Sequence, residues 1–255
     1  MTDAGARLAA RPAWPISALA DLLADASHRL ETLESLAMGD MAVRLSFDIS
    51  LHALQESPEM ADVAAAAAFG LLSLADGPDI SIMAAAAMLD QPERWAGVLL
   101  ERLVDAQLLQ TRRPGRYQFH DLLRLFGRQF AAERYPERDR LAAVTRLITF
   151  YTATAWRSLL LLRPGDHRLA TADPRWTSGG QVFSDVTQVV EWTELERGNL
   201  LAAVAQAASA TPAVPAELAG QLTRALSACF DRRGYWQDLR RASQVVLDRS
   251  CRNSA

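Results

Sequence analysis

Apolar residues recur every three or four positions along most of the chain, which is the pattern of amphipathic helices. A leucine-rich stretch over residues 15–36 predicts the first helix. Gly39 and Asp40 interrupt the pattern, and a short helix over about 43–51 is predicted to follow. We expect it to end before Pro58, because a residue that precedes proline is driven out of the helical conformation.

Three helices and a small hairpin come next, and their order is that of a winged helix. The helices are predicted over Met60–Leu74, Ile80–Leu89 and about 92–106. Two short extended segments, Leu108–Thr111 and Tyr117–Phe119, then flank a loop from Arg112 to Arg116 with Pro and Gly at its tip. The pattern therefore predicts a two-stranded wing behind three helices.

Beyond the hairpin the pattern is helical again, with one interruption. His120–Arg134 predicts an amphipathic helix whose Arg124 and Arg128 face outwards, and a further helix extends to about residue 162. The stretch from Arg163 to Val186 has several Pro and Gly and no period, so we expect a long surface loop. Further helices are predicted over Thr187–Ala210, Ala216–Arg232 and Tyr235–Arg252. The last two, joined by a glycine turn, are typical of one unit of a helical array.

The composition narrows the range of functions. The 255 residues are 50% hydrophobic and carry 27 basic against 30 acidic side chains, a net charge of −3. A charge so close to zero excludes a strongly basic nucleic-acid binder and an acidic disordered tail. Every basic residue is arginine, because the sequence contains no lysine. It therefore offers no lysine to a Walker A phosphate loop, a Schiff base or a pyridoxal cofactor.

Cysteine usage and apolar runs indicate the compartment. Cys229 and Cys251 belong to no C-x-x-C pair or Cys/His cluster, so neither a disulfide framework nor a metal site is expected. Asp3 and Arg7 precede any apolar block, unlike the residues of a secretory signal. The longest uncharged apolar run, Val63–Ala75, is shorter than the roughly 20 residues that cross a bilayer. We expect a soluble cytoplasmic protein with no membrane partner.

The sequence shows no catalytic motif. It has no H-E-x-x-H, G-x-S-x-G or G-x-G-x-x-G pattern, and its four histidines lie far apart. Nothing places a nucleophile, a base and an oxyanion site together, so we expect no enzyme. An unrecognised active site could lie only in the 163–186 loop, where we interpret Trp176 as a packed anchor.

The segment with the most chemical content, Tyr117–Arg124, lies where the wing meets the next helix. Asp121 is placed to cap that helix by accepting backbone N–H bonds. His120 lies beside the same helix end, where its ring N–H could donate to a bound anion. These residues alone also fit an ordinary cap beside a spacer residue.

Phe119-His120-Asp121, followed by Leu-Leu-Arg-Leu-Phe, resembles the Met-His-Asp motif of the NB-ARC class of signalling ATPases, the STAND proteins. The similar type is the actinobacterial antibiotic-regulatory (SARP-like) one. In it, nucleotide-binding, helical, winged-helix and tetratricopeptide regions follow in that order. Three other stretches resemble the family in the same order: Gly5–Pro12, Val43–Leu54 and Glu191–Leu200.

The helical pattern predicts an all-α protein with a small wing, and the resemblance implies a division of the chain. Its parts would be a helical-domain remnant (1–40), a winged-helix domain (41–135), a linker helix with a long loop (136–186) and a tetratricopeptide-like start (187–255). In the family the motif's histidine contacts the β-phosphate of ADP and holds the closed, inactive state. That role would fall to His120, with Asp121 supporting the local geometry and Phe119 replacing the usual Met. The winged helix would be a regulatory lid, and the repeats would sense a ligand or a partner.

The resemblance also implies what is missing. The family's phosphate loop, magnesium-binding acidic motif and adenine-contacting segment precede the counterpart of Gly5. We therefore expect the middle of a larger regulator, which hydrolyses no ATP and binds no cofactor tightly. His120 alone cannot hold a pyrophosphate, which needs a ring of backbone N–H groups.

Two functions stay open at this point. In the first, the chain is a non-catalytic regulatory fragment that acts through protein partners or self-association, with uncovered apolar surface at both ends. In the second, it is a DNA-binding winged-helix transcription regulator that contacts phosphates or a minor groove through Arg112, Arg113 and Arg116. The third helix disfavours the second function, because Glu93–Ala106 carries two arginines against three acidic residues.

Overall fold

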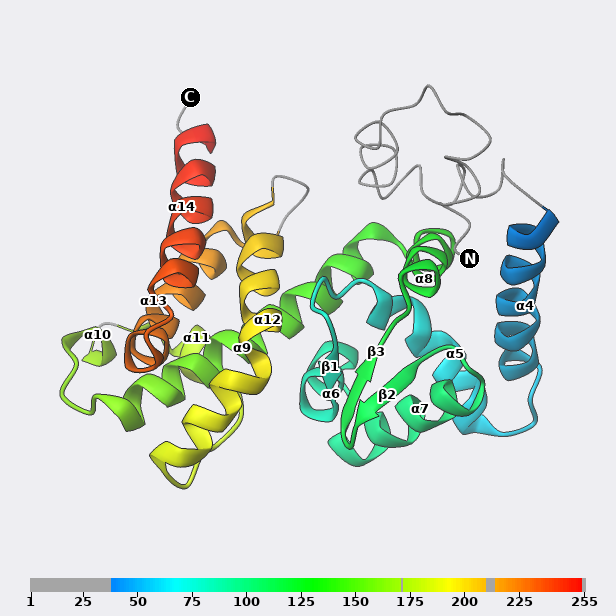
Figure 1. Ribbon diagram of the computed structural model, residues 1–255, viewed down its shortest axis with the longest axis horizontal. Coiled ribbons are helices and arrows are strands. Elements are labelled where there is room, and N and C mark those ends of the chain that lie inside the picture. Colours follow the sequence, from blue (N-terminus) through cyan, green and yellow to red (C-terminus); the bar gives the residue numbers. More distant parts are fainter. Residues whose placement is uncertain (1–37, 171, 210–213, 254–255) are drawn as a thin grey trace, which may run out of the picture.

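The computed structural model describes residues 38–170, 172–209 and 214–253. Over this part of the chain the structure is almost entirely helical, with one small antiparallel sheet, which confirms the predicted all-α class. Figure 1 shows a half that contains the sheet and a half of long C-terminal helices, joined by the helix α9. The helix predicted over 15–36, the Gly5–Pro12 stretch and most of the 1–40 region lie outside the described residues.

Helix α4, Met38–Gln55, stands at the edge of the sheet-containing half (Figure 1). It begins at Met38 and includes Gly39 and Asp40, so the predicted start at about residue 43 is wrong. A glycine inside a helix costs only about 1 kcal/mol, and packing of the apolar face outweighs that cost. Leu51 is buried, and Phe47 packs against the same core.

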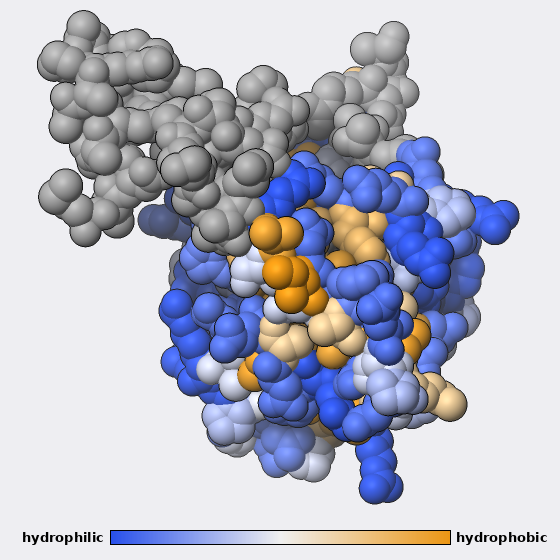
Figure 2. Space-filling view, turned by 90° about the vertical axis from the view of Figure 1, so that its right-hand side faces the viewer, coloured by the Kyte–Doolittle hydropathy of each residue, from blue (hydrophilic) through white to orange (hydrophobic). Residues whose placement is uncertain are grey.

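The other face of α4 is uncovered by the described part of the chain. Leu45 and Ile49, one helical turn apart, are 58% and 61% exposed. Figure 2 looks onto this side of the molecule and shows hydrophobic residues at its surface. Met60, at the start of the next helix, is also exposed.

The elements that follow have the order of a winged helix. Their bounds are Met60–Ser73 (α5), Ile80–Ser81 (β1), Ile82–Leu89 (α6), Glu93–Asp105 (α7), Gln110–Arg113 (β2) and Arg116–Gln118 (β3). The strands form one antiparallel sheet in the order β1-β3-β2, with Ile80 opposite Tyr117 and Gln110 opposite Gln118. The three helices agree closely with the predicted ones.

The sheet has three strands and not the predicted two. Its extra strand, β1, takes Ile80 and Ser81, which the sequence pattern assigns to the following helix. The Ser81 hydroxyl accepts the backbone N–H of Ala84 at 3.2 Å and caps α6, so that helix begins only at Ile82. Ile80 is left extended and buried, and it pairs with β3.

The turn of the wing is also tighter than predicted. Because β2 extends to Arg113 and β3 begins at Arg116, only Pro114 and Gly115 connect them. Gly115 has a φ of +72°, which side-chain-bearing residues rarely adopt. A bulge between Thr111 and Arg113 twists the outer strand.

Aromatic side chains form the core of this half and join α5 to α8, Asp121–Arg134. Phe69 of α5 is fully buried. Its ring centroid lies 5.6, 5.9 and 6.4 Å from those of Phe119, Phe126 and Phe130. The junction between the wing and α8 is therefore anchored through Phe119.

The C-terminal half consists of α9 and the elements after it. Their bounds are Glu137–Leu162 (α9), His167–Ala170 (α10), Pro174–Thr177 (α11), Val186–Ala208 (α12), Ala216–Arg233 (α13) and Trp236–Asn253 (α14). The last three match the predicted helices. The predicted loop contains the short helices α10 and α11, and Trp176 is buried where α11 packs on α9, as expected of an anchor.

Helix α9 belongs to both halves of the molecule. It packs against α6 of the winged helix and against α13 of the C-terminal half (Figure 1). Ile148 and Trp156 are among its buried side chains. The two halves therefore share one continuous core.

Candidate functional site

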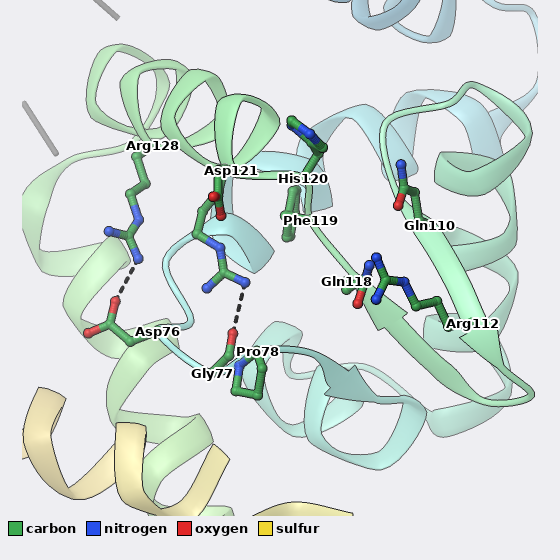
Figure 3. Close-up of a pocket in the computed structure, with 11 residues that line it drawn as sticks. Asp76, Gly77, Pro78, Gln110, Arg112, Gln118, Phe119, His120, Asp121 and Arg128 are labelled. Atoms are coloured by element: carbon green, nitrogen blue, oxygen red, sulfur yellow. Dashed lines mark hydrogen bonds and ion pairs between the residues drawn. The ribbon is translucent and has the colours of Figure 1, made fainter. Parts of the chain in front are cut away.

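A groove opens between the α5–β1 loop (residues 74–79), the wing and the start of α8 (Figure 3). Its volume is about 580 Å³. The lining residues are Asp76, Gly77, Pro78, Gln110, Arg112, Gln118, Phe119, His120, Asp121, Arg124 and Arg128. We call it the His120 groove, because it gathers the three predicted motif residues with one of the predicted wing arginines.

His120 and Asp121 form the junction between β3 and α8. The sequence predicts Asp121 as the helix cap, but His120 holds the capping position, and Asp121 is the first helical residue. The helix begins one residue earlier than a cap at Asp121 would require. Within the described residues the His120 side chain makes no capping hydrogen bond, and both side chains are exposed. The first turn of α8 is therefore open to solvent, and the Asp121 carboxylate is the acidic side chain within it.

Arg124 and Arg128 face the α5–β1 loop, so the prediction that they point outwards is wrong. Arg124 donates to the carbonyl oxygens of Ala75 at 2.6 Å and Gly77 at 2.8 Å, and Arg128 pairs with Asp76 at 2.6 Å (Figure 3). Ala75 and Gly77 lie in the loop beyond the end of α5, where carbonyls have no helical partner, and a guanidinium can bind several of them at once. Burial, followed by the positive charge of Arg128, lowers the pKa of Arg124.

Arg116 of β3 is largely enclosed by polar side chains from three other segments, and we call this group the Arg116 cluster. Its guanidinium donates to the carboxylates of Asp79 and Glu196. The Arg116 and Glu196 side chains are only 12% and 4% exposed. Asn199 donates to Asp79 at 2.9 Å and to Glu196 at 2.6 Å, and the Tyr151 hydroxyl donates to Glu196 at 3.2 Å. The cluster joins the winged helix to α9 and α12.

The electrostatics of the cluster are dominated by burial and by the two carboxylates. Burial acts to lower the pKa of Arg116, but the hydrogen bonds and charges of Glu196 and Asp79 outweigh it, and the pKa is raised. Burial and the charge of Glu196 raise the pKa of Tyr151 well above its usual range. The arginine therefore stays charged and the tyrosine stays neutral, as their hydrogen bonds require.

The other two predicted wing arginines, Arg112 and Arg113, lie on the exposed strand β2. With Arg116, Asp79, Leu195 and Gln118 they line a second hollow of about 140 Å³. This hollow shares Arg112 and Gln118 with the His120 groove. The three arginines thus line one hollow, with Arg112 and Arg113 at the surface and Arg116 bound into the cluster.

Sequence reasoning did not identify Glu196 and Asn199 as members of a polar cluster. Glu196 lies on the buried face of α12, three or four residues from Thr193 and Leu200, which are buried as well. A carboxylate within such a stripe indicates a buried partner, since charged residues are almost never buried unpaired. The sequence gives no indication of which partner that is.

The other candidate features of the described part of the chain are a possible metal site and two further histidines. No group of three or more His, Cys, Asp or Glu side chains is placed to hold a metal ion there. His52 lies near Glu56 on α4, and His167 lies near Asp166, both far from the groove in sequence. No described helix is long and apolar enough to cross a membrane.

The proteins similar to this chain are regulators. Two curated proteins, both called regulatory protein AfsR, match it over 211 residues: the one from Streptomyces coelicolor is 44% identical and the one from Streptomyces griseus 41%. The match covers 80% and 81% of this chain but only 20% of each relative, so the chain spans about a fifth of their length. No family model and no solved structure matches the sequence.

Proposed function

We propose that this chain is a non-catalytic regulatory and protein-interaction segment of a larger STAND (NB-ARC) regulator of transcription or signalling. Its similarity to a fifth of two regulatory proteins supports a regulatory role. The observation that carries the proposal is the His120 groove. There an exposed histidine and the open start of α8 form part of an anion site.

The groove supplies only a fraction of what a nucleotide needs. A pyrophosphate is held by several converging backbone N–H groups. The groove offers His120, the start of α8 and Arg112, while Arg124 is already engaged by two carbonyl oxygens. We infer that another segment of the larger regulator supplies the remaining phosphate contacts, and that the winged helix covers the nucleotide as a lid.

Titration calorimetry with ADP tests this division of the site. We expect a Kd of roughly 1 mM or weaker for this chain, since few groups contribute to binding. His120→Ala should abolish the residual binding, and His52→Ala, at an exposed histidine of α4, is the control. Micromolar ADP binding or any hydrolysis of ATP would contradict the proposal.

The uncovered apolar surfaces support a role in protein contacts. Leu45 and Ile49 lie exposed on α4, and Trp236 and Leu247 are 59% and 58% exposed on α14. Sedimentation velocity should show concentration-dependent association that Leu45→Ser with Ile49→Ser weakens. Gln237→Ala, which changes an exposed polar residue, should leave the association unchanged. A strictly monomeric wild type would contradict this part of the proposal.

DNA binding is the second candidate, and the exposed Arg112 and Arg113 favour it. The engagement of Arg116 in the cluster and the net negative charge of α7 weigh against it. A salt titration with random duplex DNA decides the question. Micromolar affinity that falls steeply with salt and is lost in Arg112→Gln with Arg113→Gln would establish it.

A further inference from the structure

We propose that residues Asp76–Asp79 form a relay that couples the His120 groove to helix α12. The anion that occupies the groove and the placement of α12 then bias each other. The inference deepens the proposed function, on which it rests for the identity of the groove's ligand. Reciprocal coupling of this kind requires two sites and one element that contacts both. The following contacts meet that requirement.

The first step of the relay connects the groove to the loop. Arg124 follows His120 by one helical turn, and its backbone N–H donates to the His120 carbonyl at 2.9 Å. Its guanidinium lies 5.9 Å from the centre of the Phe119 ring and binds the carbonyl of Gly77. A movement of the His120 segment therefore acts directly on Gly77.

The second step connects the loop to α12. Asn199 accepts the backbone N–H of Asp79 at 3.4 Å and donates to the Asp79 carboxylate at 2.9 Å. Gly77 lies so close to Asn199 that a Cβ on it would overlap the side-chain oxygen of Asn199. A Cβ on Gly198 would lie 3.0 Å from the Pro78 ring. Each residue from 77 to 79 is thus in contact with α12.

The third step is a second connection between the groove and α12, which passes through strand β3. Arg116 binds Asp79 of the loop and Glu196 of α12. It belongs to β3, the strand that ends at Gln118 on the wall of the groove. The loop and the strand therefore both extend from the groove to the same two turns of α12. The contacts of Gly77 with Asn199 and of Pro78 with Gly198 leave no room for a Cβ, so a shift of the loop at these two points is transmitted to α12 and not absorbed.

The variant Asn199→Ala tests transmission from α12 to the groove. The readout is the imidazole NMR signal of His120, with His52 and His167 as internal references. We expect the His120 signal to shift and those of His52 and His167 to stay in place. Thr193→Ala is the matched control, because Thr193 is buried on the same helix and its hydroxyl bonds to Val189 and to the Cys229 thiol of α13, not to the 76–79 loop. It should leave all three signals unchanged.

A gentler variant keeps the test decisive if Asn199→Ala does not fold. Gly198→Ala retains every polar side chain of the cluster and adds only a methyl group, which would lie 3.0 Å from the Pro78 ring. The relay predicts a shift of the His120 signal in this variant too. A His120 signal that coincides with that of the wild type in every folded variant overturns the proposal.

The reverse direction is tested from the groove. Arg124→Gln removes the bonds to the loop carbonyls without touching Asp79 or α12. Hydrogen exchange of the Asp79 amide should become about tenfold faster, the change expected when one hydrogen bond is weakened. An unchanged exchange rate at Asp79 contradicts the relay. These readouts involve no nucleotide and no partner, so they can fail while the ADP and association experiments succeed, and the reverse.

Discussion

Glu196 holds three polar partners in the Arg116 cluster. Its carboxylate accepts hydrogen bonds from Arg116, Asn199 and Tyr151, and its side chain is only 4% exposed. Two carboxylates share a single guanidinium in the cluster, so each of them is needed to keep Arg116 satisfied. Removal of one partner from such a network leaves buried donors unpaired.

Glu196→Gln should lower the free energy of unfolding by about 2 kcal/mol, because a neutral amide accepts fewer and weaker hydrogen bonds from Arg116, Asn199 and Tyr151. Urea unfolding measures the loss. Glu191→Gln makes the same chemical change at an exposed position of α12 and should stay within about 0.5 kcal/mol of the wild type. Equal stabilities for the two variants would show that the cluster adds nothing to the fold.

The buried thiol of Cys229 predicts how stability changes with pH. Burial raises the pKa of Cys229 from 9.0 to about 11, and the unfolded chain returns the thiol to water. The unfolded state therefore ionises first. The contribution of the thiol to stability is complete below pH 9 and is lost between pH 9 and 11. Burial and the bond to Glu101 raise the pKa of Tyr117 to about 12, which extends the loss to higher pH.

Urea unfolding between pH 8 and 11 measures this loss. Between pH 8 and 11 the free energy of unfolding of Cys229→Ala should fall by on the order of 2 kcal/mol less than that of the wild type. Cys251→Ser, at the exposed cysteine, should show the same fall as the wild type. An identical decline in Cys229→Ala would assign the pH dependence to other groups.

The sequence placed some residues of the groove and of the Arg116 cluster correctly and misjudged others for a common reason. His120 and Asp121 were recognisable because their neighbours in the chain define the wing and the following helix. Arg116 was expected at the surface, yet its partner Glu196 lies 80 positions away. Local pattern shows that a residue is charged, but only the tertiary fold decides which charges meet.

Close helix packing is the main feature at the scale of elements. Helices α5 and α8 cross where Gly127 meets Ser73, and a Cβ on Gly127 would lie 2.6 Å from the Ser73 Cβ. Real Cβ atoms do not approach so closely, so the crossing requires glycine. The same approach brings Arg124 and Arg128 of α8 within reach of the α5–β1 loop.

Gly127→Ala should therefore destabilise the protein by about 1–3 kcal/mol, although alanine is the better helix former. Gly220→Ala provides the opposite case. That glycine lies in α13 with open space where its Cβ would be, and the substitution should stabilise the protein by about 0.5–1 kcal/mol. Thermal unfolding of both variants measures whether each substitution raises or lowers the stability of the protein. A stabilised Gly127→Ala would mean that α5 and α8 separate at little cost.

The long amphipathic helices were predictable, and the exceptions have local causes. Helices α7, α9 and α12–α14 each carry several turns of apolar periodicity, which a single sequence displays well. Strand β1 is two residues long, too short to show alternation, and the cap formed by Ser81 decides its end. The short helices α10 and α11 each have four residues, about one turn, which leaves no period to detect.

At the scale of the whole molecule, the shared core and the Arg116 cluster predict cooperative unfolding. Pulsed hydrogen exchange in increasing urea should show peptides from α7 and from α13 losing protection at the same midpoint. In Glu196→Gln the midpoints should separate, because α12 is then held less firmly to the winged helix. Separate midpoints in the wild type would mean that the halves fold independently.

The position of α9 has a practical consequence for anyone who dissects this protein. The buried residues of α9 pack against both α6 and α13, so a fragment that ends at Tyr135, directly after α8, lacks the helix that covers α6. We expect such a fragment to expose apolar surface and to precipitate. Fragment libraries that are used to map partners and are cut at that point would then report nonspecific binding to the exposed apolar surface as specific binding. Fragments for such screens should carry α9 in full.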